Sequence, residues 1–318
     1  MASIASSTPE GLFDGLAGRL TPFTPGAAAP DDGGYLAYYG LDFKDRYPNR
    51  QYSIGQVNSG RFRLAVQSWH SDSAPATLYL VHGLFDHVGL YSHLVRLGLA
   101  QGMNVVAFDL PGHGLSSGAR AEIDDFDDYR AAIADVINAT TMLPGPRHVI
   151  AQSTGGAAVM DYLQCGGDAF TGVVLLAPLI WPQGWRRARL AHALLRHLVA
   201  GVPRGFAENS HDQAFLRFLR TDPLQPQAIS VAWISALADW LKRFLAREPC
   251  PAPLLVMQGD EDSTVDWRRN LPQLQRSFPN ARIETLPAGR HHLANEHPPI
   301  REPMAAAIAD YLAATAAA

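Results

Sequence analysis

The sequence predicts an α/β fold with a mostly parallel, doubly wound sheet and a helical segment inserted late in that sheet. Short apolar runs of strand length alternate with helical patterns between residues 77 and 177, which is typical of parallel sheets. From about residue 179 to 250 helical patterns occur without a convincing strand, and the alternation resumes at 253–258. The chain has 318 residues, 47% of them hydrophobic, which is enough for the core of one large domain.

Residues 1–48 are predicted to form an extension that packs on the core. Positions 21–34 are rich in Pro, Gly and Ala and are expected to be irregular. The aromatic residues that follow are expected to pack on the main domain rather than to form a site. Two strand-like runs, 51–57 and 62–69, are joined by Asn-Ser-Gly and predict a hairpin.

The core and the inserted segment follow from the order of the remaining elements. Buried apolar runs predict strands at 77–81, 104–108, 148–151, 172–177, 253–258 and 282–286. Helical patterns occur at 91–101, 126–142, 157–164, 267–277 and 300–316 within the core and at 186–200 and 229–247 within the insertion. We therefore assign residues 49–179 and 251–318 to the core and 180–250 to a helical lid. Such a lid would cover the carboxyl edge of the sheet, where open α/β sheets bind ligands.

Composition excludes several classes of protein. A net charge of −4 and a pI of about 6.3 do not favour nucleic-acid binding. The two cysteines, Cys165 and Cys250, do not imply a disulfide framework. The first residues lack the basic and apolar regions of a secretory signal, and no apolar run is long enough to span a membrane. We therefore expect a soluble, cytoplasmic protein.

Ser153 lies between a buried strand and a helical pattern, with Gly155 and Gly156 close behind it. A strand, a sharp turn and a helix are the context of a nucleophile elbow, in which the turn exposes the serine hydroxyl. Glycine at 155 permits close approach of the backbone. The following helix directs its N-terminal amides toward developing negative charge. The usual pattern is G-x-S-x-G, but Ala151 replaces the first glycine. A serine that only caps a helix is the alternative.

A nucleophilic serine needs a base and an acid that orients the base, and the chain offers both. Asp260, Asp262 and Asp266 lie in the loop after the strand 253–258, and His291 and His292 follow the last strand. The order Ser, Asp, His differs from those of the chymotrypsin and subtilisin types. Because each candidate follows a strand, all three groups are expected at one edge of the sheet.

Two backbone N–H groups are candidates for an oxyanion hole. His82 and Gly83 directly follow the strand 77–81, and a turn there can present the N–H of Leu84. The N–H of Thr154, which follows the nucleophile, would be the second donor.

Five stretches together resemble the monoglyceride lipase and lysophospholipase group of the α/β-hydrolase family. They are HGxxxH followed by Tyr at 82–91, D-x-x-GHG-x-S at 109–118, the nucleophile stretch at 151–156, G-x-x-D-x-x-V at 259–265 and H-x-x-x-N-E at 291–296. They span most of residues 77–300 but not the N-terminal extension or most of the lid. Five motifs in the family's order are a specific signal, whereas any one alone is weak.

The resemblance implies an α/β-hydrolase fold and a role for each candidate residue. Ser153 is the nucleophile and His291, rather than His292, is the base. Asp262 is the orienting acid, with Asp260 and Asp266 as alternatives. Leu84 and Thr154 supply the oxyanion hole, and no metal or organic cofactor is needed. His82, His87 and His113 are expected to hold loops by hydrogen bonds.

A metal site is the rival interpretation of the histidines. His291, His292, Glu296 and His297 are dense enough for a metal cluster, but they lack a partner at zinc-site spacing. We therefore predict no metal.

The predicted lid suggests what is bound. Seven aromatic residues are candidates to line an apolar acyl pocket, with simple packing as the alternative: Trp181, Trp185, Phe206, Phe215, Phe218, Trp233 and Trp240. An amphipathic stripe of Leu190, Leu194 and Leu198 occupies the first lid helix. Its basic cluster would attract anionic headgroups or a membrane surface, unless it is only a solvated face: Arg186, Arg187, Arg189 and Arg196.

The predicted function is hydrolysis of carboxylic esters with apolar acyl chains, such as monoacylglycerols, lysophospholipids or small synthetic esters, through an acyl-enzyme on Ser153. Alternatives on the same triad are a perhydrolase and an aminopeptidase, whose substrate amine would need a lid acid such as Glu208, Asp212 or Asp239. Dehalogenases and epoxide hydrolases use Asp in place of Ser153 and are disfavoured. A non-catalytic binding protein with this fold is a further alternative.

Overall fold

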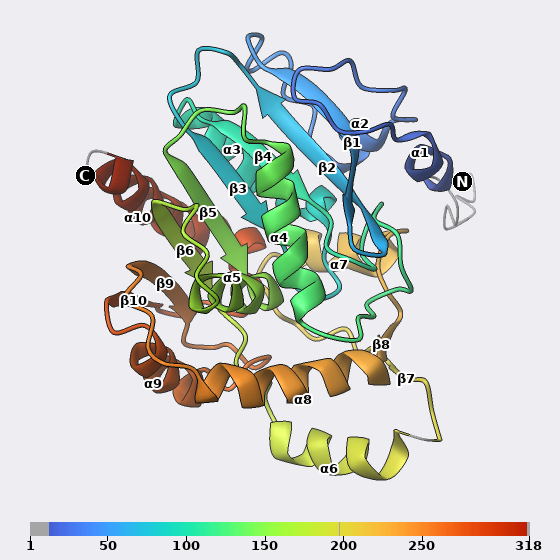
Figure 1. Cartoon of the computed structure of the whole chain (residues 1–318), viewed down its shortest axis with the longest axis vertical. Coiled ribbons are helices and arrows are strands. Elements are labelled where there is room, and N and C mark those ends of the chain that lie inside the picture. The colour runs from blue at the N-terminus through green and yellow to red at the C-terminus, as the bar shows by residue number, and fades with distance from the viewer. Residues whose placement is uncertain (1–12, 197, 317–318) are drawn as a thin grey trace, which may run out of the picture.

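The computed structural model describes residues 13–196 and 198–316 and contains an eight-stranded sheet (Figure 1). Its spatial order is β1-β2-β4-β3-β5-β6-β9-β10. The strands are β1 (Gln51–Ser59), β2 (Phe62–His70), β3 (Thr77–Val81), β4 (Asn104–Phe108), β5 (Arg147–Gln152), β6 (Gly172–Leu176), β9 (Leu254–Gly259) and β10 (Ala281–Leu286). Strand β2 runs antiparallel to β1 and β4, and the pairs from β4 to β10 are parallel. The predicted mostly parallel sheet is therefore confirmed.

Helices cover both faces of this sheet, and the strand sequences show why. Along β3, Leu78 and Leu80 belong to one cluster of buried side chains, and Tyr79 and Val81 belong to the other. Alternate residues of a strand point to opposite faces, so a strand covered on both sides is apolar throughout. The first cluster includes side chains of α3 (Ser92–Ala100) and α10 (Pro298–Ala316). The second includes side chains of α4 (Asp127–Ala139), α5 (Thr154–Gln164) and α9 (Trp267–Ser277).

The N-terminal segment contributes two short helices, α1 (Asp14–Arg19) and α2 (Tyr35–Tyr39). Between them the chain is largely irregular, as expected, and Pro22 forms a bridge with Gln56 of β1. Tyr35 and Tyr39 are buried, and the ring of Tyr39 lies 5.0 Å from that of His87. The segment therefore contacts the loop that follows β3.

Five elements lie between β6 and β9: α6 (Trp185–Leu195), β7 (Gly201–Pro203), α7 (Gln213–Thr221), β8 (Ala228–Ser230) and α8 (Val231–Ala246). The expectation of a segment without strands was wrong, because β7 and β8 form a small antiparallel sheet. Three-residue strands are too short to show a sequence period. Helix α6 lies at the edge of the molecule, with α8 between it and the core (Figure 1).

Candidate active site

Ser153 occupies a strained turn at the carboxyl end of β5. Its φ of 52° and ψ of −112° are unusual for a residue with a side chain. Its N–H donates to the carbonyl of Leu176, at 2.9 Å. A Cβ at Gly155 would lie 2.4 Å from the carbonyl oxygen of Val81, so this position tolerates only glycine. Close contact between β3 and the start of α5 therefore holds the turn that carries the serine.

His291 links Ser153 to an acid. Its Nε2 lies 2.9 Å from Oγ of Ser153, and its Nδ1 lies 2.8 Å from Oδ2 of Asp262. The side chain of Gln152, next to the serine, donates to the His291 carbonyl at 2.7 Å. The three side chains come from the ends of β5, β9 and β10, and the structure brings them into one hydrogen-bonded chain.

Asp262 is fixed by further donors. Its Oδ1 accepts from the N–H groups of Thr264, at 2.8 Å, and Val265, at 3.1 Å. Its Oδ2 also accepts from Nε2 of Gln258, at 2.9 Å. These bonds orient one carboxylate edge toward His291.

The alternative acids and the second histidine do not join the hydrogen bonds from Ser153 through His291 to Asp262. Asp260 instead accepts from the N–H of Ala288, at 2.7 Å. Nε2 of His292 lies 3.2 Å from Oδ2 of Asp86. Asp266 precedes α9, and its N–H donates to the carbonyl of Trp181.

His291 and Asp262 shift each other's pKa. Burial lowers the pKa of His291, but the Asp262 carboxylate outweighs burial and raises it above its ordinary value. Burial raises the pKa of Asp262, but His291 outweighs it and holds that pKa below its ordinary value. The arrangement strengthens His291 as a base toward the serine hydroxyl.

Leu84 and Thr154 both line the cavity in front of Ser153. In the described chain neither backbone N–H donates a hydrogen bond to another residue, which leaves both available to a ligand. The loop of Leu84 is held from outside the cavity, since the N–H of Gly83 donates to the Tyr91 hydroxyl at 3.2 Å. Phe85 adopts a φ of 71°, a conformation that favours glycine.

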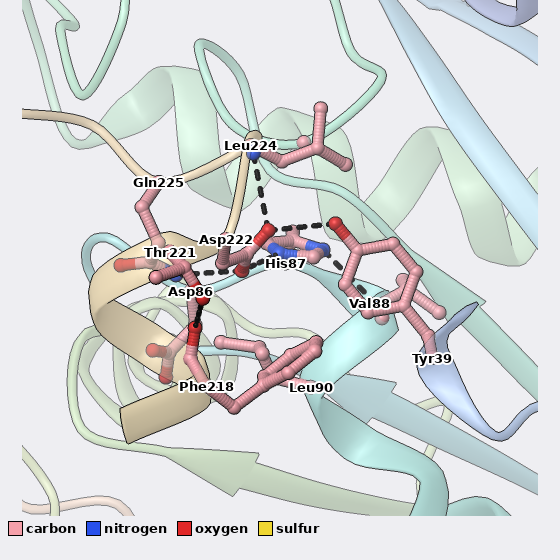
Figure 2. A network of polar contacts seen from close by, with 12 residues as sticks. Tyr39, Asp86, His87, Val88, Leu90, Phe218, Thr221, Asp222, Leu224 and Gln225 are labelled. Atoms are coloured by element: carbon pink, nitrogen blue, oxygen red, sulfur yellow. Dashed lines mark hydrogen bonds and ion pairs between the residues drawn. The ribbon is translucent and has the colours of Figure 1, made fainter. Parts of the chain in front are cut away.

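A second buried histidine holds the end of this loop (Figure 2). Nε2 of His87 lies 2.7 Å from Oδ2 of Asp222, and the Tyr39 hydroxyl donates to Oδ1 at 2.7 Å. Nδ1 of His87 accepts from the N–H of Gly89, at 3.1 Å. His87 therefore carries its proton on Nε2. The N-terminal segment, the β3 loop and the segment after α7 meet at Asp222.

The other two loop histidines also have hydrogen-bond partners. Nε2 of His82 accepts from the N–H of Leu110 at 2.8 Å, and Nδ1 of His113 lies 2.9 Å from the carbonyl oxygen of Pro111. The expectation that these side chains hold loops agrees with the contacts.

The cavity at Ser153 has a volume of about 220 Å³. Apolar side chains form much of its wall: Leu84, Phe85, Leu179, Pro182, Ile229, Trp233 and Val265. Of the seven aromatic residues expected to line an acyl pocket, Trp233 does. Trp240 instead stacks on Phe126 with ring centroids 4.9 Å apart, and its Nε1 donates to Asp161. For most of the seven the packing alternative is the correct one.

Residues 13–196 and 198–316 contain neither a metal-binding cluster nor a membrane-spanning helix. Those residues contain no group of three His, Cys, Asp or Glu side chains placed to hold a metal ion. Their helices include none of the length and apolarity needed to cross a membrane.

Sequence reasoning missed several residues of the site. Gln152 and Gln258 are buried and support the histidine and the aspartate, and each occupies or adjoins the last position of a strand. A polar residue at the end of a strand, directly before a predicted catalytic loop, is a signal by which the sequence could have revealed both residues. Asp222 and Arg204 had no such signal, because neither adjoins a predicted strand; Arg204 also lines the cavity.

Several known proteins are similar in sequence to this chain. A family model described as "Serine aminopeptidase, S33" matches residues 72–298. The monoacylglycerol lipase of Mycolicibacterium smegmatis is 28% identical over 256 residues, covering 74% of this chain and 89% of that protein. Human monoglyceride lipase is 25% identical, covering 76% and 84% of the two chains.

Solved structures show the same fold. The crystal structure of Paleococcus ferrophilus monoacylglycerol lipase superposes with a TM-score of 0.69 at 23% identity, covering 79% of this chain and 99% of that one. Because the family model covers most of the chain, the protein belongs to the serine aminopeptidase S33 family of α/β-hydrolases and is similar to the monoacylglycerol lipases.

Proposed function

We propose that the protein is a serine hydrolase that cleaves carboxylic esters with apolar acyl chains. The observation that carries the proposal is the chain of hydrogen bonds from Ser153 through His291 to Asp262, which opens on a cavity with apolar walls. Relatives named monoacylglycerol lipase, phospholipase and lysophospholipase support an ester as the substrate.

The geometry suggests a mechanism with two stages. Ser153 Oγ attacks the ester carbonyl while His291 Nε2 accepts its proton and then passes it to the leaving alcohol. Asp262 holds the imidazole and stabilises the imidazolium. The N–H groups of Leu84 and Thr154 bind the oxyanion. Water, activated by His291, then releases the acyl group from Ser153.

The size of the cavity bears on the acyl chain. Its volume of about 220 Å³ lies below the roughly 300–1,000 Å³ of typical ligand sites. We therefore expect short acyl chains to fit the arrangement shown, whereas the longer chains of monoacylglycerols and lysophospholipids require the segment between β6 and β9 to move.

The contacts of the three lid acids disfavour an aminopeptidase that would rely on them. Asp212 caps α7 by accepting from the N–H groups of Ala214 and Phe215. Asp239 pairs with Lys242 on the surface, and Glu208 is 65% exposed and lies 3.6 Å from Arg290. None of the three acids lines the described cavity, so none is placed to receive a substrate amine.

We further propose that α6 contacts lipid surfaces. Leu190, Leu194 and Leu198, on and just beyond this helix, are 65%, 68% and 76% exposed. Exposed leucines beside basic residues are typical of helices that lie on membranes. Replacing the three leucines by Ser should abolish sedimentation with anionic phosphatidylglycerol vesicles, and unchanged sedimentation contradicts this contact.

The test of the main proposal is hydrolysis of p-nitrophenyl esters from acetate to palmitate by the wild type and Ser153→Ala. We expect wild-type turnover and a loss of about 10⁶-fold in the variant, as for removal of a covalent nucleophile. Absence of ester hydrolysis, or a variant that retains the rate, contradicts the proposal, and aminoacyl amides would be tried next. Failure of Ser153 to react with a serine-directed phosphonate would favour a non-catalytic protein.

A further inference from the structure

The cavity at Ser153 contains a guanidinium group on an otherwise largely apolar wall. Arg204 follows β7 and lines the same cavity as Ser153 and Leu84. Its backbone N–H donates to the carbonyl of Gln227 at 2.9 Å. The guanidinium carbon lies 4.2 Å from the ring centroid of Phe85 and 4.7 Å from that of Phe206. Two aromatic rings thus lie against the charged group.

This positive charge has no acidic partner at contact distance. Within residues 13–196 and 198–316, no Asp or Glu forms an ion pair with Arg204, and its one side-chain hydrogen bond runs from Nη1 to Oε1 of Gln225. Burial lowers the pKa of Arg204, against the opposing effect of the Asp86 and Asp222 carboxylates. A partly buried arginine normally has a carboxylate or another anion beside it. The remaining N–H groups are therefore free to bind a ligand.

An acid on the cavity wall, Asp86, is already engaged elsewhere. Asp86 accepts from the Tyr91 hydroxyl at 3.1 Å and lies 3.2 Å from Nε2 of His292. Burial raises the pKa of Asp86, but His292 outweighs it and the pKa stays below its ordinary value. Asp86 is thus a charged group with its own partners, and it acts on Arg204 through its charge without an ion pair at contact distance.

Further polar atoms of residues on the wall lack hydrogen-bond partners. Oδ1 of Asn209 and Oγ1 of Thr154 are buried and make no hydrogen bond in the described structure. Both residues line the cavity with Arg204. Buried polar atoms normally find partners, so unpartnered ones in a cavity indicate a polar ligand. A molecule with hydroxyl groups and one anionic group would satisfy all three side chains.

We propose that Arg204 binds an anionic group, a phosphate or a carboxylate, on the alcohol part of the ester substrate. The proposal rests on the ester hydrolysis proposed above. The apolar wall suits the acyl chain, which leaves the guanidinium for the alcohol. A planar guanidinium held between two aromatic rings matches the two oxygens of such an anion. Arg204 is thereby a specificity-determining residue that selects anionic esters over neutral ones.

The test compares 1-butyrylglycerol with 1-butyrylglycerol 3-phosphate, which differ only in the anionic group. We expect wild-type kcat/KM to favour the phosphate ester. Arg204→Gln should lower the ratio of the two kcat/KM values by about tenfold or more, mainly through KM. Arg204→Lys should retain part of the preference because it keeps the charge. Arg217→Gln removes an equal charge from an exposed position of α7 and should keep the wild-type ratio.

A ratio that is the same in the wild type and Arg204→Gln overturns the proposal, as does a wild-type preference for the neutral ester. If neither ester is hydrolysed, the proposed ester hydrolysis fails, and binding decides the role of Arg204 separately. Glycerol 3-phosphate should then raise the Tm of the wild type but not of Arg204→Gln. An equal rise with inorganic phosphate at the same ionic strength would show a free-anion site and overturn the substrate assignment.

Discussion

The protein contains two buried histidine–aspartate pairs with nearly the same geometry and different surroundings. In one, His291 lies 2.8 Å from Asp262, and in the other, His87 lies 2.7 Å from Asp222. Both histidines are buried, and in each case the carboxylate raises the pKa of the histidine against the opposing effect of burial. The pairs differ in the group that faces the second ring nitrogen of the histidine, the one that does not contact the aspartate.

The second nitrogen decides what each pair can do. Nε2 of His291 faces the hydroxyl of Ser153, a group that can give up a proton. Nδ1 of His87 faces the N–H of Gly89, which occupies the nitrogen and donates no proton in catalysis. His87 is also absent from the residues that line the described cavity. A histidine–aspartate pair is thus a sign of catalysis only when its third member is a nucleophile or a substrate.

The largest predicted difference is between His291→Ala and His87→Ala. We expect His291→Ala to lower kcat/KM for p-nitrophenyl butyrate by about 10⁴- to 10⁶-fold with little change in the urea midpoint. His87→Ala should lower the urea midpoint and reduce activity far less, because it loosens a loop without removing the base. Comparable losses of activity in two equally stable variants would contradict the division of roles.

Asp222→Asn should cost about 2–4 kcal/mol of unfolding free energy, measured by urea denaturation. Its carboxylate accepts from His87, the Tyr39 hydroxyl and the N–H of Leu224, and a neutral amide cannot replace it for all three. The matched control is Asp239→Asn, whose exposed pair with Lys242 should contribute less than about 1 kcal/mol. Equal effects of the two substitutions would show that Asp222 does not lock the segments together.

The two pairs also differ in how far the sequence reveals them. Ser153, Asp262 and His291 follow predicted strands whose carboxyl ends meet at one edge, so strand order was enough to bring them together. The sequence identified His87 as a loop residue but not its partner, which lies 135 residues away. Asp222 follows α7, in a segment whose packing depends on contacts rather than on a periodic pattern.

The same limit explains the errors in the inserted segment. Two of its helices, α6 and α8, were predicted, but α7 was not, and β7 and β8 are only three residues long. Trp240 looked like a candidate pocket residue, yet it stacks on Phe126, which is distant in the sequence. Local patterns identify elements, whereas the side that a given aromatic residue faces depends on tertiary packing.

The pH dependence of activity should reflect the His291–Asp262 pair and not the His87–Asp222 pair. His291 must be neutral to accept the serine proton, and its pKa is raised by Asp262. We therefore expect kcat/KM to fall as the pH drops through a midpoint above the ordinary histidine value of 6.5. Asp222→Asn should keep this midpoint, since Asp222 faces His87. A midpoint below 6.5, or one moved by Asp222→Asn, would contradict the assignment.

The smallest predicted effect is that of Tyr39→Phe, which removes one donor from the second pair. Burial raises the pKa of Tyr39, so its hydroxyl is protonated and donates to Asp222 at 2.7 Å. A hydrogen bond to a charged acceptor contributes about 1.5–3 kcal/mol. The N–H of Leu224 still satisfies the same carboxylate oxygen, so we expect a loss near the lower end of this range.

Tyr38→Phe is the matched control for this measurement. Tyr38 packs against Phe218 at 5.3 Å between ring centroids and makes no side-chain hydrogen bond within the described structure. Its substitution should leave the urea midpoint nearly unchanged, while Tyr39→Phe lowers it and leaves kcat/KM within a few-fold of the wild type. If Tyr39→Phe instead lowers kcat/KM by orders of magnitude at unchanged stability, the second pair takes part in catalysis. The second pair would then act on the oxyanion loop rather than only hold the N-terminal segment to the core.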